Sequence, residues 1–144
     1  MLEVNFYDDI GDKLLKFAVI IAKTNNKWVF CKHKKRSTYE IPGGHRENNE
    51  TIMETACREL KEETGATNFN ITDICVYSVK GKTTINKTDD EETFGMLFYA
   101  EIFSFEEIDS EIEKIVITDE LIEDWTYPLI QPKLIKEAHK RGFC

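Results

Sequence analysis

The sequence predicts an α/β fold in which a mixed β-sheet lies between helices. Three observations lead to this class: β-branched and aromatic runs near the N-terminus, one long amphipathic stretch that ends before Gly65, and further strand-like runs followed by a closing helical stretch. Strands before and after one long helix bury their apolar faces when helices cover the sheet they form. The chain has 144 residues and no repeat, low-complexity segment or linker, so we expect a single domain over residues 1–144.

The N-terminal part predicts strands joined by tight turns. Runs rich in β-branched, aromatic and other apolar residues indicate strands at residues 2–7, 17–22, 28–32 and 39–41. The pair Asn25-Asn26 is typical of a hairpin turn between the second and third of them. Ile41 and Pro42 then lead into Gly43-Gly44, which predicts a short strand that enters a glycine loop. Without side chains there, backbone groups can approach a ligand closely.

The next stretch predicts a half-buried helix. Its apolar and small residues recur at spacings of three and four, which places them in a stripe along one side. The stripe contains Met53, Ala56, Cys57, Leu60 and Thr64. Asn48 or Asn49 suits the N-cap, and Glu50 near the first turn suits the helix dipole. Gly65 suits the left-handed residue that ends a helix.

The C-terminal half predicts three more strands and a second helix. The strands are expected at residues 71–79, 93–103 and 112–117, and the helix at 129–140. Phe94 and Phe98 are core candidates by alternation. Proline at 128 and 132 is compatible with a helix start. The polar loop 80–90 is long enough to carry function, and we hypothesise that it closes over a substrate.

Three acidic residues of the first helix, Glu59, Glu62 and Glu63, lie at positions i, i+3 and i+4 and share one face. Carboxylates placed side by side repel one another, so the helix gains nothing from them alone. A hard divalent cation such as Mg²⁺ removes this repulsion, because it prefers oxygen ligands. The apolar stripe points about a third of a turn away. The helix can therefore bury one side and present the other to a metal site.

The stretch that contains these carboxylates resembles a Nudix box, the pattern G-x5-E-x7-R-E-U-x-E-E-x-G-U, in which U is a bulky aliphatic residue. Residues of this chain fill all its fixed positions in register: Gly44, Glu50, Arg58, Glu59, Leu60, Glu62, Glu63 and Gly65. Ala66 is the one departure, in the last aliphatic position, where it affects packing rather than chemistry. The box covers about a sixth of the chain, and so many residues at fixed spacing form a specific motif.

The resemblance implies an α/β/α sandwich and hydrolysis of a nucleoside diphosphate linked to another group, with Mg²⁺ or Mn²⁺ as cofactor. The implied metal ligands are Glu59, Glu62, Glu63 and the carbonyl of Gly43. The implied catalytic residues are Glu59, Glu62, Arg58 and Glu50. Glu59 is the first candidate for the base that deprotonates water. Arg58 orients the carboxylates through charge-assisted hydrogen bonds, and Glu50 assists it. Such ions neutralise pyrophosphate oxygens and activate water at neutral pH.

Basic and acidic residues outside the box offer further candidates. Lys34, Lys35 and Arg36 precede the strand that leads into the glycines, where they either hold substrate phosphates or form a solvated loop. Glu111 and Glu113, like Glu101, either complete the site or are ordinary surface acids. His45 is weak evidence beside the motif, and Trp28 and Trp125 either stack on a base or pack in the core.

Composition is ordinary for a soluble globular protein, with 41% hydrophobic and 32% charged residues. The net charge of −8 argues against a stable nucleic-acid complex but allows a phosphorylated small substrate once a cation is bound. No apolar run approaches a membrane span, and no signal peptide opens the chain. We therefore expect no membrane association and a cytoplasmic location.

None of the four cysteines forms a CxxC pair, and their spacings fit no zinc pattern. We expect three of them, Cys31, Cys57 and Cys75, to be small buried residues and the terminal Cys144 to be exposed. Such cysteines agree with a reducing compartment. The resemblance leaves the oligomeric state open, with a homodimer as one expectation.

Substrate choice depends on residues outside the box. The family hints for ADP-ribose or dinucleoside polyphosphates, a proline or a tyrosine past the box, are not met in residues 77–84. The length and the TYEIPGG segment are similar to compact MutT-like enzymes, which favours a nucleoside triphosphate, including oxidised ones. The alternatives are an ADP-ribose or nucleotide-sugar pyrophosphatase and a nucleotide-binding domain without hydrolysis. A Ca²⁺-stabilised structural helix ranks below these.

Overall fold

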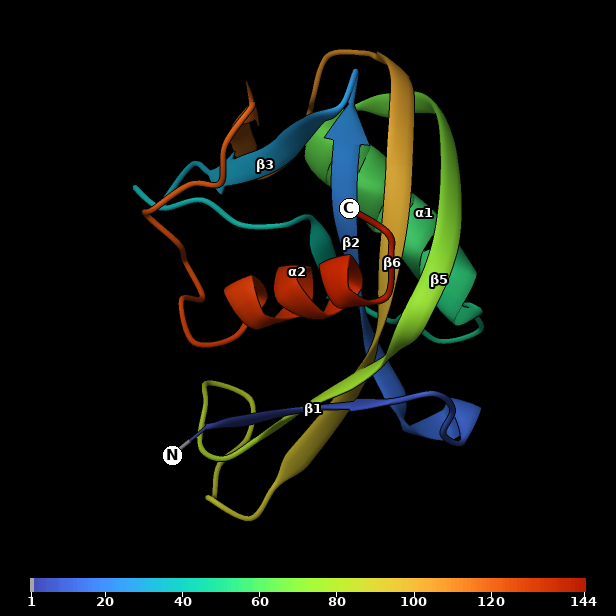
Figure 1. The fold of residues 1–144 in the computed structure, drawn as a ribbon, viewed down its shortest axis with the longest axis vertical. Coiled ribbons are helices and arrows are strands. Elements are labelled where there is room, and N and C mark those ends of the chain that lie inside the picture. The colour runs from blue at the N-terminus through green and yellow to red at the C-terminus, as the bar shows by residue number, and fades with distance from the viewer. Residues whose placement is uncertain (1) are drawn as a thin grey trace.

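The computed structural model describes residues 2–144, which form one seven-stranded sheet between two helices (Figure 1). The strands are β1 (Glu3–Tyr7), β2 (Leu15–Thr24), β3 (Lys27–His33), β4 (Gly43–His45), β5 (Ala66–Lys80), β6 (Glu92–Phe105) and β7 (Ile112–Thr118). The helices are α1 (Ile52–Thr64), α2 (Gln131–Lys140) and the short 3-10 turn η1 (Asp12–Leu14).

The sheet is mixed, as predicted. Its strand order is β1-β5-β6-β2-β3-β7, and β4 pairs with β2 beside this path. The strands β2 and β6 run parallel, and the other pairs are antiparallel. The predicted turn at Asn25 and Asn26 joins β2 to β3, and both residues have positive φ, which Asn tolerates in tight hairpins.

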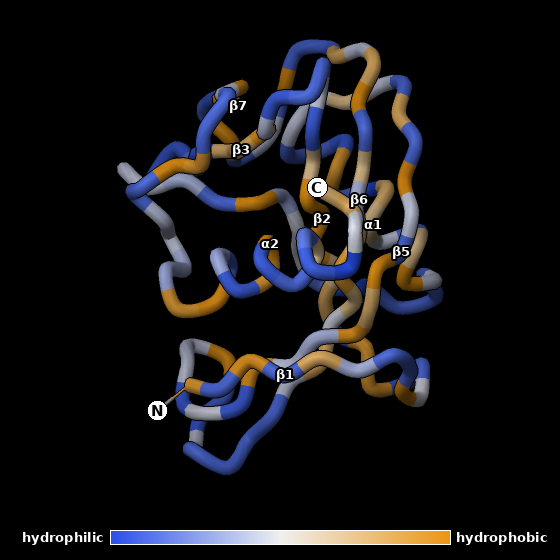
Figure 2. Tube along the Cα trace, in the orientation of Figure 1, coloured by the Kyte–Doolittle hydropathy of each residue, from blue (hydrophilic) through white to orange (hydrophobic). Residues whose placement is uncertain are grey.

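Alternation along the central strand β2 explains the three layers. Ala18 and Ile20 share one buried cluster with Ala56 and Leu60 of α1. Ile21, the next residue and therefore on the opposite face, belongs to the second cluster, with Leu134, Ile135 and Ala138 of α2. In Figure 1, α2 lies in front of the sheet and α1 behind it. Figure 2 shows apolar residues along the central strands and hydrophilic residues in the outer loops. The predicted α/β/α sandwich is confirmed.

The N-cap of α1 is Thr51, so the prediction of Asn48 or Asn49 is wrong. The Thr51 hydroxyl accepts a hydrogen bond from the Glu54 amide, and the Glu54 carboxylate accepts one from the Thr51 amide. This reciprocal pair is a capping box. Asn49 instead lies in the preceding turn, with φ 67°. At the other end, Gly65 adopts the predicted left-handed conformation, with φ 79°.

Replacing Thr51 by Ala is expected to lower the free energy of unfolding by about 1 kcal/mol, because the Glu54 amide loses its acceptor. Urea unfolding measures this loss. Thr51→Ser retains a hydroxyl and should stay within a few tenths of a kcal/mol of the wild type. Equal losses in both variants would show that the hydroxyl does not stabilise the helix.

The buried side of α1 differs from the predicted stripe. Ala56, Leu60 and Thr64 are buried as expected, but Met53 is exposed and Cys57 is only half-buried. Cys31 and Cys75 are buried as predicted. Cys144, expected to be exposed, is half-buried, because the end of the chain folds back so that Phe143 and Cys144 pack against the α2 cluster.

The other differences concern element boundaries. The glycines 43 and 44 lie within β4, which pairs with β2, rather than in a loop. Residues 39–41 form no strand, and only isolated bridges join Tyr39 to Trp125 and Glu40 to Cys31. Helix α2 begins at Gln131, two residues later than predicted. No helix within residues 2–144 has the length and apolar character needed to cross a membrane.

Candidate active site

Arg58 lies at the centre of the acidic cluster on α1. Its guanidinium donates two hydrogen bonds to Glu50, at 2.6 and 3.0 Å, and one to Glu59 at 2.8 Å. A longer contact of 3.4 Å reaches Glu62, and a bond of 3.0 Å reaches the carbonyl of His45 on β4. The bidentate pair lowers the pKa of Glu50 to about 2 and raises that of Arg58. Arg58 thus holds the helix, the preceding turn and β4 together.

Glu63 is the most deeply placed of the three carboxylates, with 9% of its surface exposed. Burial raises its pKa to about 8, and the neighbouring Glu59 and Glu40 add to the rise. The Gly43 amide opposes it by donating a hydrogen bond of 2.8 Å to the carboxylate. The imidazole Nε2 of His33 lies 3.5 Å from the other carboxylate oxygen. Burial also raises the pKa of Glu59, against the effect of Arg58.

The two glycines of β4 make room for this cluster. A Cβ on Gly44 would lie 2.5 Å from the carboxylate carbon of Glu59, and a Cβ on Gly43 would lie 2.5 Å from the carbonyl oxygen of Ala18. Real Cβ contacts are not this short. The strand therefore needs glycine at position 43, where the obstacle is backbone, whereas a side chain at position 44 would displace the Glu59 carboxylate from its present place.

This donor set fits a hard divalent cation. It offers carboxylate oxygens at close quarters, and their raised pKa values show that negative charge is costly there. Within residues 2–144, no three His, Cys, Asp or Glu side chains are already gathered around one point as metal ligands. Arg58 binds Glu59 and contacts Glu62, and the Gly43 amide binds one oxygen of Glu63. Metal binding therefore requires side chains to turn, and Glu62, whose side chain is 52% exposed, has the room to do so.

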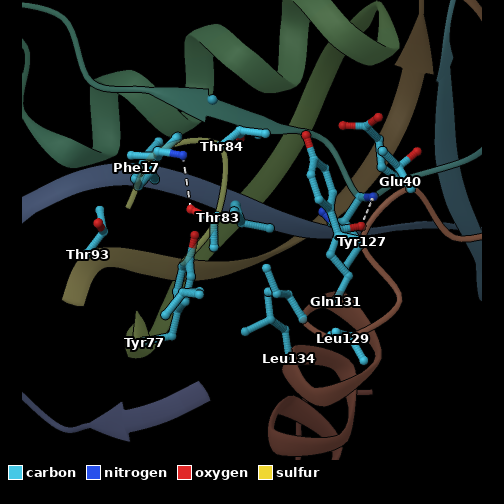
Figure 3. Close-up of a pocket in the computed structure, with 18 of the residues that line it drawn as sticks. Phe17, Glu40, Tyr77, Thr83, Thr84, Thr93, Tyr127, Leu129, Gln131 and Leu134 are labelled. Carbon is cyan, nitrogen blue, oxygen red and sulfur yellow. Dashed lines mark hydrogen bonds between the residues drawn. The ribbon is translucent and has the colours of Figure 1, made fainter. Parts of the chain in front are cut away.

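A cavity of about 600 Å³ opens beside Glu63 (Figure 3). Gly43, Gly44 and Glu63 are among the residues that line it, whereas Glu59 and Glu62 are not. Its apolar walls include Val19, Ile41, Val79 and Leu134. In Figure 3, Tyr77 and Thr93 stand on the opposite side of the cavity from Glu40 and Tyr127. This size and lining are typical of a small-molecule site.

The predicted loop after β5 forms part of the cavity wall. Residues 82–86 line the cavity, and Asn86 within them is buried. Its amide donates to the carbonyls of Val79 and Glu91 at 2.9 and 3.1 Å, and its oxygen accepts a bond from Thr93. Asn86 thus fixes the shape of the loop. Closure of this loop over a substrate stays a prediction.

Of the basic and acidic candidates outside the box, one lines the cavity and the others lie on the exposed surface. Arg36 lines the cavity, whereas Lys34 and Lys35 are exposed and are not among the lining residues. Glu113 pairs with Lys32 at 2.9 Å on the surface, and Glu111 is exposed. Glu101 is likewise exposed.

The two tryptophans and His45 are also placed. Trp28 and Trp125 both pack around Phe30, with ring centroids 6.4 and 5.4 Å from its own, which supports the packing interpretation. His45 lies on β4 and lines the cavity, with its ring centroid 4.5 Å from that of Phe17. Of the core candidates, Phe98 is buried, whereas Phe94 is half-buried beside Tyr7.

Sequence reasoning missed a second buried acid, Glu40. Its carboxylate accepts a bond of 2.7 Å from Arg36 and lies 3.7 Å from His33 Nε2, which also faces Glu63. The Arg36 guanidinium lies 5.9 Å from the ring centroid of Tyr127 at the cavity mouth. The sequence signal that could have identified Glu40 is its position, as a charged residue directly before Ile41 in an apolar segment.

Without a bound cation, the protein is expected to lose stability between about pH 5 and pH 8, because of Glu63. Its folded pKa of about 8 lies above the ordinary value of 4.5, so the folded state keeps a proton that the unfolded chain releases in this interval. The unfolded chain then binds fewer protons, and rising pH favours unfolding. Glu50, with a pKa of about 2, is ionised throughout.

Thermal melts in EDTA at several pH values measure this effect. Glu63→Gln cannot ionise and should remove most of the decrease, whereas Glu107→Gln, on the exposed surface, should retain it. The same pH trend in the wild type and in Glu63→Gln would show that Glu63 does not cause the loss.

Comparison with known proteins gives a consistent family. The NUDIX domain family matches residues 13–142. YtkD of Bacillus subtilis (strain 168), which carries the name of an 8-oxo-dGTP diphosphatase, is 36% identical over 81 residues, covering 56% of this chain and 51% of YtkD. The match thus spans about half the length of that relative.

Solved structures agree on the fold. The pyrophosphohydrolase BsRppH of Bacillus subtilis superposes with a TM-score of 0.78 and 25% identity, covering 99% of this chain and 92% of that one. A MutT NUDIX hydrolase from Burkholderia pseudomallei, at 19% identity, has a TM-score of 0.62 over 83% of this chain and 94% of its own. Since the family match extends over most of the sequence and includes every residue of the acidic cluster, the chain belongs to the NUDIX domain family.

Proposed function

We propose that the chain is a divalent-metal-dependent pyrophosphohydrolase that cleaves a nucleoside triphosphate, including oxidised ones. The observation that carries this proposal is that Glu63, which shares a helix face with Glu59 and Glu62, lines a largely apolar cavity of about 600 Å³. Phosphates require positive charge, which a cation on the carboxylates provides, and a nucleobase requires an apolar pocket. The names of YtkD and BsRppH agree with hydrolysis of a phosphoric anhydride.

The proposed residue roles are those that the motif implies, and the contacts around Arg58 support them. Glu59, Glu62, Glu63 and the Gly43 carbonyl would hold Mg²⁺ or Mn²⁺. A bound ion of this kind supplies positive charge against the phosphate oxygens and makes water acidic enough to act as a nucleophile near neutral pH. Arg58 holds Glu59 in place at 2.8 Å, and Glu50 fixes Arg58. Glu59 is the proposed proton acceptor.

Arg36 is the proposed phosphate contact among the basic residues, because it lines the cavity and Lys34 and Lys35 do not. Arg36 would then bind both Glu40, its partner in this structure, and a phosphate of the substrate. We also propose, from the sequence, a cytoplasmic location and a homodimer. Neither affects the proposed chemistry.

Phosphate and pyrophosphate release from a panel of compounds tests the proposal. The panel contains the common nucleoside triphosphates, 8-oxo-dGTP, ADP-ribose, a nucleotide sugar and a dinucleoside polyphosphate, each with Mg²⁺ and then Mn²⁺. We expect turnover of triphosphates that EDTA abolishes. Turnover confined to ADP-ribose or the nucleotide sugar would show that the substrate is one of these compounds rather than a nucleoside triphosphate. Turnover that survives EDTA would contradict the metal requirement.

A further inference from the structure

Two buried polar groups face the cavity without a protein partner. Tyr77 and Gln131 line it, and only 6% and 5% of their surfaces are exposed. Among residues 2–144, neither the Tyr77 hydroxyl nor the Gln131 Nε2 group makes a hydrogen bond to another residue, whereas Gln131 Oε1 accepts one of 2.8 Å from the Ile41 amide. Every fully enclosed side-chain nitrogen or oxygen within residues 2–144 has a hydrogen-bond partner. The two groups without a partner are therefore not fully enclosed, and they are reached from the cavity.

Both groups are held in fixed positions. The Tyr77 ring lies against Gly95, its partner on β6, where an added Cβ would come within 2.7 Å of the ring. Gln131 is the first residue of α2, and its bond to Ile41 fixes which way the amide faces. Figure 3 shows Tyr77 and Gln131 around the space above Leu134. Buried polar groups normally have partners, so a pair of fixed, unpartnered groups in one cavity points to a ligand.

The chemistry of the two groups restricts that ligand. Because Gln131 Oε1 is already bonded to Ile41, the amide presents its N–H groups to the cavity. A tyrosine hydroxyl can donate or accept. An amide N–H donates a hydrogen bond to a carbonyl oxygen on the ring of a base. An exocyclic amino group at the same position is itself a donor and would leave the amide without an acceptor. In the proposed function, the phosphates lie with the cation beside Gly44 and Glu63, which leaves the apolar lining of the cavity, with Tyr77 and Gln131, for the base.

We propose that Tyr77 and Gln131 select the base of the substrate and favour a base with a carbonyl group, such as guanine or uracil, over its amino counterpart, adenine or cytosine. The inference rests on the proposed function, since it names the base of the same nucleotide. Two comparisons isolate the choice: GTP with ATP and UTP with CTP. Within each pair the triphosphate and ring size are the same, so the ratio of kcat/KM values reports the base alone.

Two substitutions test the residues. Tyr77→Phe removes only the hydroxyl and should lower the GTP-to-ATP ratio by roughly fivefold to tenfold, the effect of one hydrogen bond. Gln131→Glu can still accept from the Ile41 amide but presents an acceptor to the cavity, and should lower the ratio by about a hundredfold. Tyr99→Phe, half-buried and outside the cavity, is the matched control and should leave the ratio unchanged.

The outcomes are distinguishable. A preference for GTP and UTP that weakens in Tyr77→Phe and Gln131→Glu but not in Tyr99→Phe supports the inference. A wild type that hydrolyses triphosphates without this preference, or variants that keep it, overturns the inference and leaves the proposed function standing. A wild type that turns over no nucleoside triphosphate overturns both. If Gln131→Glu does not fold, the Tyr77→Phe ratio decides.

Discussion

Glu62→Gln is expected to lower turnover by roughly a thousandfold or more, with little effect on folding. Glu62 is exposed, and its one contact within the cluster is the 3.4 Å approach to Arg58, which contributes little to stability. Its carboxylate is nevertheless one of three on the same helix face, and Gln has almost the same shape without the charge. Steady-state kinetics together with thermal melts measure both effects.

Glu107→Gln serves as the control for charge, because it removes one exposed carboxylate far along the sequence from the helix. It should change neither turnover nor stability appreciably. A Glu62→Gln variant that keeps wild-type turnover would mean that the acidic face is not the metal site. A variant that instead loses most of its thermal stability would indicate a structural role for Glu62.

Gly65→Ala is expected to lower the free energy of unfolding by about 3 kcal/mol. Gly65 ends α1 in the left-handed conformation, with φ 79°, which alone costs an alanine about 1 kcal/mol. An added Cβ would also collide with the carbonyl oxygen of Glu106, a backbone atom that cannot turn aside. Gly65 accepts a bond of 2.7 Å from the Glu106 amide, so the two segments cannot separate without losing it.

Gly142→Ala separates the two contributions. Gly142 also has a left-handed conformation, with φ 90°, but an added Cβ there meets no atom within 4 Å. Its substitution should therefore cost only about 1 kcal/mol. Urea unfolding of both variants gives the comparison. Equal costs would show that the Glu106 contact is relieved by a small movement and that conformation alone explains the effect.

Local pattern was sufficient to predict much of the fold and the acidic cluster. The positions of Glu59, Glu62 and Glu63 on one face, and Gly65 at the end of α1, follow from helix periodicity and the glycine preference of left-handed backbone. The hairpin at Asn25-Asn26 is similarly local. These features depend on residues a few positions apart, which a sequence displays directly.

Features that depend on distant contacts could not be predicted. Ile41 and Gln131 are 90 positions apart, yet their hydrogen bond orients the amide that faces the cavity. Glu40 forms a bridge with Cys31 of β3, and the same strand brings His33 within 3.7 Å of its carboxylate. The N-cap is a different case, because its signal is local: Thr51 and Glu54 stand three residues apart, the spacing of a capping box, and the prediction of Asn48 or Asn49 overlooked it.

The measurement that tests the central claim most directly is ³¹P NMR of GTP incubated with the wild-type chain, first with Mg²⁺ and then with excess EDTA. We predict that the triphosphate signals are replaced by those of a shorter nucleotide and of phosphate or pyrophosphate when Mg²⁺ is present, and persist when EDTA is added. Unchanged GTP in Mg²⁺, from a protein shown to be folded, or equal cleavage in EDTA would contradict a metal-dependent nucleoside triphosphate pyrophosphohydrolase.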